Sequence, residues 1–483
     1  MTLTFTPRRL LNGALTMGAI ALVAVLYLTN LSSMGLLSTD EPRYADIGRG
    51  MAQSGDWITP RLWGQAWFEK PPLLYWMVAA GFKLGLGPET APRLPVALMA
   101  LLFLAFFWFR LRHLWDARTA TCSTLLLASG AGWQAYSRVA VTDIPAAVLF
   151  SMAVLLAPKK DQTMRQTDTR FTLIAALLGL ATLAKSLFPL VLFLPVLALD
   201  YRRLRMWFRP GPLLAFAAVS LPWHVLCAAR NGPEFLRILF VQHQFGRFTS
   251  PDLQHSQPWW FYLPVLLLLL YPWSPLLVLA AGRQRDRSDP RLRPLLGVVA
   301  FGFLFISVTV NKLPGYLLPL LPSLCVLIGV GLARHRNPAR LLIAPVALLG
   351  VLPVAARVVP AALATGLHTA AIPWPLLPFW LGVALLAGSL FPVVFKRFSF
   401  CAAAGCAAFS FLWFQFAVFP QIDSIVSARP LWIALHPSCV PELHRRLRYG
   451  LNYYAGRELP RCDILIHAAP PVAREPARPV KTK

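Results

Sequence analysis

The sequence predicts an all-α polytopic membrane protein with about thirteen transmembrane helices, external interfacial helices and a short external C-terminal tail. Only 14% of its 483 residues are charged, 57% are hydrophobic, and the mean hydropathy is +0.57. Apolar runs of roughly 18 to 22 residues, long enough to cross a bilayer, recur along the chain. Soluble domains carry about 25% charged residues. This composition therefore excludes a soluble globular protein.

The formal net charge of +26 would indicate nucleic-acid binding in a soluble protein, so its distribution decides what it means. Lys and Arg gather in alternate loops between the apolar runs, which the positive-inside rule assigns to the cytoplasm. These clusters are Arg8-Arg9; Arg110, Arg112 and Arg118; Lys159, Lys160, Arg165 and Arg170; Arg202, Arg203, Arg205 and Arg209; Arg283, Arg285, Arg287, Arg291 and Arg293; Arg334, Arg336 and Arg340; and Lys396-Arg397. Topology explains most of the charge, and no nucleic-acid partner is expected.

The same assignment gives the order of the expected spans. They lie at approximately residues 13–31, 93–109, 119–137, 143–158, 171–184, 187–200, 211–229, 258–281, 294–310, 314–333, 341–362, 374–395 and 399–419. The first run is expected to be retained, because it is long and lacks a small-x-small cleavage site. The apolar stretch 72–87 is left out, since counting it would place basic loops on both sides, and we expect it to lie in the interface. The N-terminus is then cytoplasmic and the tail external.

The predicted organisation has three parts. Residues 1–420 form the membrane domain that carries the site, with 32–92 as its first external loop. Residues 421–469 form a small external region, which could add a small sheet over the site. The Pro- and charge-rich segment 470–483 is expected to be disordered. Cys439 and Cys462 both fall in the external tail, where a disulfide is a hypothesis for an oxidising compartment.

Ionisable residues that topology does not require fall on one face of the predicted membrane domain, the external one. They are Asp40, Glu41, Glu69, Lys70, Asp143, Lys185, His243, Arg247, His255, Lys312 and Tyr316. Positive-inside placement disfavours basic residues there, so these cations beside external carboxylates need another explanation. A site that handles an anionic, membrane-borne substrate supplies it.

The motif TDEPRY at residues 39–44 carries an acidic pair directly after the first apolar run. Asp40 and Glu41 could simply cap a helix. They also suit acid-base catalysis, because neighbouring carboxylates repel and one pKa rises. Arg43 would lie on the same helical face and could clamp a phosphate bidentately, and Tyr44 beside it is assigned to substrate binding.

Three further elements each have a plain structural alternative. Glu69 and Lys70 in the motif EKPP are candidates for catalysis and substrate binding, although such a pair can also mark a helix entry. Asp143 in the motif VTDIP is a second catalytic candidate or a helix N-cap. Lys185 interrupts an apolar stretch without an adjacent acid, so its ammonium reaches either an anion or, by snorkelling, water.

The loop from Gly232 to Pro258 mixes basic and aromatic residues. His243 and Arg247 are four residues apart, which is consistent with a phosphate or metal site, although interfacial aromatic anchoring explains such a stretch equally well. Lys312 and Tyr316, in the motif NKLPGY, are assigned to substrate binding, with a turn carrying an interfacial tyrosine as the alternative.

Taken in order, these motifs carry a family resemblance. The segment DEPRYADIGRGMAQSGDWITPRLWGQAWFEKPPLLYW, then VTDIP, Lys185, VQHQFGRFTSPDLQHSQPWWFY and NKLPGYLLP resemble the polyprenol-phosphate-dependent glycosyltransferases of the GT-C fold. Within them the chain is most similar to the bacterial aminoarabinose transferases of lipid A and their protein-mannosyltransferase relatives. The resemblance runs from about residue 10 to about residue 335.

The resemblance implies an inner-membrane enzyme that moves a sugar from undecaprenyl phosphate to lipid A or another periplasmic glycan, lipid or protein. It makes Asp40 and Asp143 the catalytic candidates and places Glu69 and Lys70 near the head groups. Positions that hold the carrier phosphate in the family are matched by Arg43, Lys185 and Arg247. His243 matches a histidine that could share a divalent metal ion with Glu69, and no other cofactor is implied.

Two other functions stay open from the sequence. A flippase or transporter of lipid-linked sugars would keep its polar site near the bilayer midplane, whereas these residues sit at one rim. A polymerase or ligase of lipid-linked sugars would use the same carrier and the same face. The sequence shows no P-loop or Gly-rich nucleotide motif, which disfavours a nucleotide-sugar donor. The tail is shorter than that of the lipid A enzymes, and neither sugar nor acceptor can be inferred.

Overall fold

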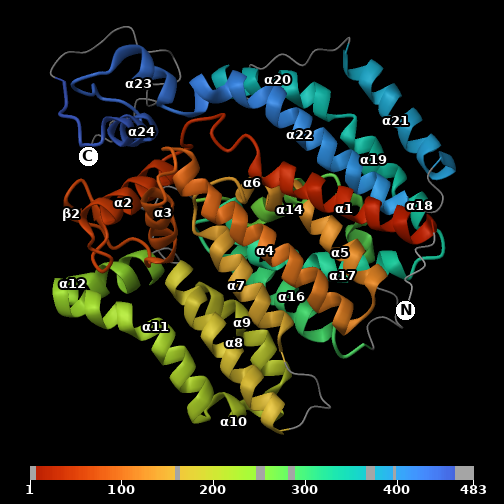
Figure 1. Ribbon diagram of the computed structural model, residues 1–483, viewed down its shortest axis with the longest axis horizontal. Helices are drawn as coiled ribbons and strands as arrows, with labels where there is room; N and C mark the ends of the chain where they lie inside the picture. The colour runs from red at the N-terminus through yellow and green to blue at the C-terminus, as the bar shows by residue number, and fades with distance from the viewer. Residues whose placement is uncertain are drawn as a thin grey trace.

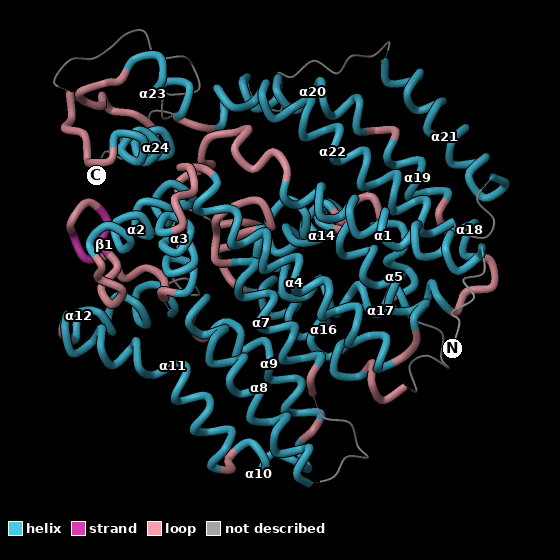
Figure 2. Tube along the Cα trace, in the orientation of Figure 1, coloured by secondary structure: helices cyan, strands magenta, loops and turns pink. Residues whose placement is uncertain are grey.

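The computed structural model describes residues 7–157, 164–245, 256–280, 289–365, 376–394 and 399–462. Within these residues helices make up almost all regular structure, and the one sheet is a short antiparallel hairpin of β1 (Arg61–Leu62) and β2 (Gln65–Ala66). Figure 2 shows this predominance of helix along the whole trace. The predicted all-α class is therefore confirmed.

The first half of the chain contributes helices to the left, the lower part and the centre of the molecule, and its N-terminus lies at the right (Figure 1). Its helices are α1 (Pro7–Leu28), α2 (Asp40–Ser54), α3 (Leu73–Lys83), α4 (Thr90–Leu114), α5 (Ala117–Ala128), α6 (Ala131–Tyr136), α7 (Asp143–Leu155), α8 (Met164–Lys185), α9 (Phe188–Leu199), η1 (Tyr201–Arg203), α10 (Leu204–Trp207), α11 (Pro210–Asn231), α12 (Pro233–Leu236) and the π-helix η2 (Arg237–Phe245).

The second half completes the bundle and ends in two short helices. Its helices are η4 (Trp259–Phe261), α14 (Tyr262–Leu269), η5 (Ser274–Leu279), α16 (Arg293–Val308), η6 (Pro314–Leu320), α17 (Leu321–Ala333), α18 (Pro338–Leu341), α19 (Ile343–Leu349), α20 (Leu352–Thr365), α21 (Leu376–Val394), α22 (Ser399–Val426), α23 (Arg429–Leu435) and α24 (Arg445–Ala455).

Helices occupy every segment that the sequence predicts as a span, and the stretch left out of that count forms α3. Among the described residues, five helices are long and apolar enough to cross a membrane on their own: 90–114, 210–231, 314–333, 338–363 and 399–426. The protein is thus a multi-pass membrane protein, while the total of thirteen spans stays a prediction. Some expected spans are broken. The segment 258–281 is interrupted where Pro272 and Pro275 remove backbone donors.

Small residues allow close packing in the centre of the bundle. A methyl group added at Gly329 in α17 would lie 2.2 Å from Ser123 Oγ in α5, so the two helix backbones approach as small-residue membrane contacts do. Helix α17 is buried on nearly all sides, with its described side chains among the largest apolar cluster. Such a helix serves as the core around which the others pack.

The end of the molecule opposite the N-terminus gathers α2, α3, the hairpin and the two C-terminal helices (Figure 1). As far as residue 462, where the described part ends, the tail forms α23 and α24, and its strand pairing is a single parallel bridge between Val440 and Arg461 in place of the small sheet that the sequence left open. The expected disulfide between Cys439 and Cys462 is present. Segment 470–483 lies outside the described residues.

Candidate active site

Two arginines from distant helices hold the irregular segment that leads into α2. Arg93 of α4 donates from Nη1 to the carbonyls of Leu31 and Met34, at 2.6 and 2.7 Å, and from Nη2 to that of Gly35, at 2.8 Å. Arg429 of α23 donates to the two carbonyls between them, of Ser32 at 2.6 Å and Ser33 at 2.7 Å. Every backbone carbonyl from residue 31 to residue 35 therefore accepts a hydrogen bond from a guanidinium. These bonds hold the loop in place although it forms no helix or strand.

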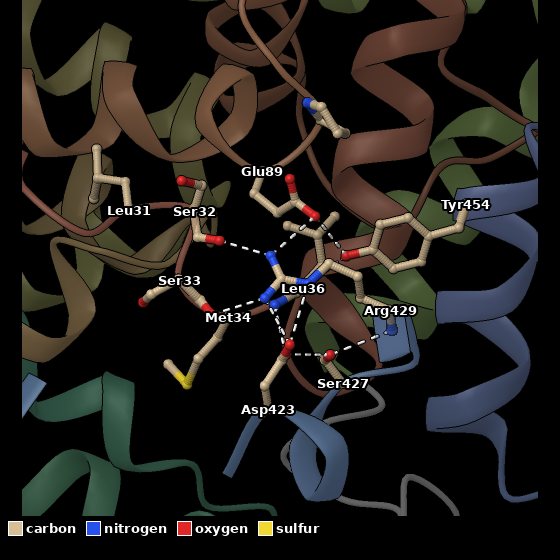
Figure 3. A network of polar contacts seen from close by, with 12 residues as sticks. Leu31, Ser32, Ser33, Met34, Leu36, Glu89, Asp423, Ser427, Arg429 and Tyr454 are labelled. Atoms are coloured by element: carbon tan, nitrogen blue, oxygen red, sulfur yellow. Dashed lines mark hydrogen bonds and ion pairs between the residues drawn. The ribbon is translucent and has the colours of Figure 1, made fainter. Parts of the chain in front are cut away.

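The amide groups of the same loop are bound by the C-terminal region (Figure 3). Asp423 Oδ1 accepts from Gly35 N at 2.7 Å, and Tyr454 Oη accepts from Leu36 N at 3.1 Å. Asp423 also pairs with Arg429, and Tyr454 donates to Glu89 at 3.1 Å. The tail thus helps to position the start of α2.

Glu41, the second carboxylate of the acidic pair, faces into the protein. Its side chain is 0% exposed and accepts from Arg93 Nε and Nη2 at 2.7 and 2.8 Å. It also accepts from the backbone amides of Leu37 at 2.7 Å and Ala140 at 2.9 Å. Both oxygens are therefore committed to structural partners. This geometry argues against the catalytic role predicted for Glu41 and against proton sharing with Asp40.

Asp40 begins α2 and faces a different partner. Its Oδ1 accepts from Arg43 Nη2, as the three-residue spacing predicts, and its side chain is 38% exposed. Arg43 Nη1 donates to Glu69 Oε2 at 2.9 Å and Nε donates to the carbonyl of Thr39 at 3.0 Å. Arg43 therefore joins the first carboxylate of the acidic pair to Glu69. The structure brings together these two sequence-predicted motifs.

Lys70 completes this first cluster. Its Nζ lies 3.4 Å from Glu69 Oε1, and both side chains are buried. Burial lowers the pKa of Arg43, but the charges of Glu69 and Asp40 outweigh this and raise it, so the guanidinium stays protonated. Burial also raises the pKa of the Tyr44 phenol well above its ordinary value. Tyr44 is therefore neutral beside the carboxylates of Asp40 and Glu69 and the guanidinium of Arg43.

A second cluster joins the start of α7 to the end of α8. Lys185 Nζ donates to Asp143 Oδ1 at 2.6 Å and lies 4.6 Å from the ring centroid of Tyr316. Lys185 has no acidic residue next to it in the sequence. Its partner is Asp143, which lies 42 residues earlier. A methyl group at Gly315 would lie 2.3 Å from Asp143 Oδ1 and 3.0 Å from Tyr136. Only glycine leaves room for this carboxylate.

The two clusters are linked through neighbouring residues. The bond from Ala140 N to Glu41 ties the segment before Asp143 to the start of α2. Phe68, which precedes Glu69, shares a buried apolar cluster with Leu183, two residues before Lys185. These contacts hold both cation-carboxylate groups on the same part of the fold.

Among the other predicted residues, the structure describes Lys312. Lys312 is buried and donates to the carbonyls of Gln257, at 3.0 Å, and Thr309, and burial lowers its pKa. It therefore closes a turn. His243 lies in η2, but its side chain, like the whole of Arg247 and His255, lies outside the described residues.

The described partners of Glu69 disfavour a divalent metal ion beside it. The partners that the structure gives it include the cations Arg43 and Lys70, which repel a metal. No group of three or more His, Cys, Asp or Glu side chains gathers within the described ranges. The side chain of His243 is not among them, so the expected metal site stays untested and no step is derived through it.

Sequence reasoning missed three residues that shape the site. Arg93 stood at the edge of an expected span, where a charge so close to an apolar run was the available signal. Arg429 and Tyr449 lie in the tail, far from the motifs. Tyr449 reaches Arg43, whose Cζ lies 5.2 Å from its ring centroid. No local pattern relates these positions, so only the fold could reveal them.

Known proteins are similar in sequence to the part of the chain that carries both clusters. Residues 14–231 match the family model described as dolichyl-phosphate-mannose-protein mannosyltransferase. The undecaprenyl phosphate-alpha-4-amino-4-deoxy-L-arabinose arabinosyl transferase of Pseudomonas paraeruginosa is 34% identical over 333 residues, which are 65% of this chain and 58% of that protein. The transferase of the same description from Pectobacterium carotovorum is 35% identical over 330 residues, covering 64% and 57%. The chain thus spans less than two thirds of these relatives' length.

The fold is found among solved structures. ArnT from Cupriavidus metallidurans bound to undecaprenyl phosphate is similar with a TM-score of 0.74 and 24% sequence identity, over 92% of this chain and 85% of that one. This likeness confirms the predicted GT-C type of membrane bundle. It also extends past residue 335, where the sequence resemblance fades.

Proposed function

The chain resembles the polyprenyl-phosphate-dependent glycosyltransferases of the GT-C fold, and on that premise we propose that it transfers a sugar from undecaprenyl phosphate to an envelope acceptor such as lipid A. The family match over residues 14–231 covers α2, α7 and α8, which carry Asp40, Asp143 and Lys185. The relatives named above are arabinosyl transferases that use an undecaprenyl phosphate carrier. The sugar and the acceptor of this chain are not assigned.

One observation carries the proposal: two candidate catalytic carboxylates are each paired with a cation whose side chain is largely, though not fully, buried. Arg43 binds Asp40, and Lys185 binds Asp143 at 2.6 Å. A substrate phosphate would compete with these carboxylates for the same N–H groups, so binding the carrier and releasing the carboxylate would be coupled. The Asp40 side chain is 38% exposed, so a substrate can reach its carboxylate. A purely structural ion pair does not require this access.

The chemistry follows from charge. Breaking the bond between the anomeric carbon and the phosphate oxygen leaves a polyprenyl phosphate that carries an additional negative charge. Cations fixed at that oxygen stabilise the charge as it develops, and such preorganised groups usually contribute most to the rate. Arg43 and Lys185 are the residues proposed for this role, with Lys70 nearby and Arg247 assigned by resemblance alone.

The carboxylates act on the acceptor. Asp40 is proposed to orient the acceptor oxygen and, where that oxygen is a hydroxyl, to take its proton. An acceptor phosphate is already ionised, so the carboxylate would then only position it. Attack from the face opposite the leaving phosphate inverts the anomeric centre. Asp143 is the second candidate for this role.

The proposed location is the bacterial inner membrane, with the site facing the periplasm. Helix α2, which carries Asp40 and Arg43, lies at the end of the molecule opposite the N-terminus (Figure 1), and the basic loops favour a cytoplasmic N-terminus. A disulfide in the C-terminal region suits an oxidising compartment such as the periplasm. The region 421–469 is proposed to be an external unit that supports the site.

The test uses membranes that lack a native enzyme of this type. The wild-type chain and Asp40→Asn are expressed at equal levels, and lipid A and total glycolipids are measured by mass spectrometry. We expect a sugar-sized mass increment with the wild type and none with the variant. A wild type that adds no sugar but changes the sidedness of the lipid-linked sugar would instead support a flippase.

A further inference from the structure

Aromatic rings from distant parts of the chain surround Arg43. Its Cζ lies 5.2 Å from the ring centroid of Tyr449 in α24 and 5.6 Å from that of Trp67. Tyr449 stacks on Trp63, with centroids 5.5 Å apart and planes 26° from parallel. Arg448 lies over the other end of this stack, 5.8 Å from Trp63. Two stacked rings, one from α24 and one from the hairpin turn, therefore lie between a cation of α2 and a cation of α24.

The backbone of Trp63 is strained in a way that this stack explains. Trp63 and Gly64 form the two-residue turn between β1 and β2, with φ of 51° and 83°. Turns of this kind need positive φ and usually place Asn, Asp or Gly there. A bulky indole in the left-handed region is an outlier that persists only where surrounding contacts hold it. Its contacts with Tyr449 and Arg448 are among those that hold it.

The rings complete the fixation of Arg43. Bonds to Thr39, Glu69 and Asp40 orient the guanidinium fork within its own plane. These three bonds lie along the N–H groups and therefore in the plane of the guanidinium. They oppose a tilt of the guanidinium out of that plane less strongly than a movement within it. The Tyr449 ring, with the guanidinium carbon over its face, adds a cation–π attraction that resists displacement of the guanidinium.

Helix α24 is itself firmly seated on α2. Arg49 Nη2 donates to the carbonyl of Tyr453 at 2.8 Å, and Arg49 Cζ lies 4.4 Å from the Tyr453 ring. Tyr453 Oη donates to the carbonyl of Pro88 at 2.7 Å. These contacts, one turn along α24 from Tyr449, keep its ring against Arg43.

We propose that Tyr449 is a positioning residue for Arg43, so that the C-terminal helix α24 forms part of the substrate site. The proposal rests on the proposed function, which gives Arg43 the phosphate of the carrier. Helix α24 lies outside residues 14–231, which match the mannosyltransferase family model. Tyr449 acts through Arg43 and need not touch the substrate.

The test measures binding of undecaprenyl phosphate alone to the full-length purified protein in nanodiscs. We expect Tyr449→Leu to weaken binding roughly three- to tenfold, the range of a cation–π contact, and Tyr449→Phe to restore it. In an Arg43→Gln background the same leucine substitution should have no further effect, because the coupled partner is already gone. Trp63→Leu offers a second test that leaves α24 unchanged, with the same expected loss and the same dependence on Arg43.

A matched control separates positioning from helix packing. Leu451→Ala removes a buried side chain of α24 that packs in the C-terminal apolar cluster. The proposal is overturned if Leu451→Ala weakens binding as much as Tyr449→Leu at an equal loss of Tm. It is also overturned if Tyr449→Leu binds like the wild type while Arg43→Gln binds weakly, a result that leaves the proposed function intact. If Arg43→Gln binds like the wild type, the role of Arg43 fails and the proposal with it.

Discussion

Glu41 and Arg93 form a buried fork-to-fork ion pair, with Arg93 Nε and Nη2 at 2.7 and 2.8 Å from the two Glu41 oxygens. The same guanidinium binds three carbonyls of the loop before α2. The pair therefore sets where α2 begins, and so where the adjacent Asp40 is presented. Two neighbouring carboxylates of one motif have separate tasks.

Replacing Glu41 by a neutral residue should lower the stability of the fold around the site and not act on catalysis directly. Glu41→Gln leaves Arg93 with an unbalanced buried charge, a change that costs about 3 to 5 kcal/mol. We expect a large fall in Tm by thermal unfolding in detergent. Asp40→Asn is the matched control, because this half-exposed side chain should lose transfer activity with a Tm close to the wild type. Equal Tm values for the two variants would show that Glu41 has no structural role.

Gly315 should be intolerant of a single methyl group. In Gly315→Ala the new Cβ would lie 2.3 Å from Asp143 Oδ1, so Asp143 must move away from Lys185. Misplacing a catalytic group by about 1 Å can cost roughly 10²-fold in rate. We expect a loss of sugar transfer of that order at nearly unchanged expression. Gly18, where a methyl group meets nothing within 4 Å, is the control position for the same substitution.

Arg429 should control whether the C-terminal helices stay attached. Arg429→Lys cannot reproduce a fork that binds Asp423 and two loop carbonyls at once, and each lost bond to a charged group costs about 1.5 to 3 kcal/mol. Limited proteolysis should then cut the segment between α23 and α24 faster than in the wild type. The control variant Arg237→Lys changes an exposed ion pair with Glu234. We expect the protease to cut this variant at the wild-type rate. Equal rates for all three proteins would refute the anchoring role.

Asp56 gives the protein a defined acid sensitivity. Partial burial raises its pKa, but hydrogen bonds from the amides of Thr59 and Ile58 and the charge of Arg230 outweigh this and lower it below the ordinary 3.8. A lowered acid pKa contributes stability above the unfolded value, and that stability is lost as pH falls through the folded value. Asp56→Asn should therefore lower Tm at pH 7, with the difference from the wild type shrinking below about pH 4. A difference independent of pH would contradict this.

The sequence predicted the helices well because each apolar run has to satisfy its own backbone in a membrane. It also singled out Asp40, Arg43, Glu69, Asp143 and Lys185, which the structure shows in ion pairs, since charges are rare enough in this chain to stand out; their roles stay a prediction. The pairing of Asp143 with Lys185 was not predicted, because their contact depends on how α7 packs against α8.

The distinct roles of Asp40 and Glu41 could not be read from the motif. Adjacent helical residues point about 100° apart, so one of the two must turn away, and only the position of Arg93 decides which. The contacts of Arg429 and Tyr449 with the N-terminal loop and α2 span several hundred residues. Such contacts have no periodic signature in sequence and follow from the tertiary fold alone.

We propose that the two cation-carboxylate clusters together transfer a sugar from polyprenyl phosphate. The most direct measurement follows release of undecaprenyl phosphate from a radiolabelled undecaprenyl-phosphate sugar by the purified protein, with lipid A as acceptor. We expect release coupled to labelling of the acceptor, reduced about 10²-fold or more in Asp40→Asn and Lys185→Met. Release at the wild-type rate by both variants, or movement of the intact donor across the bilayer without release, would contradict it.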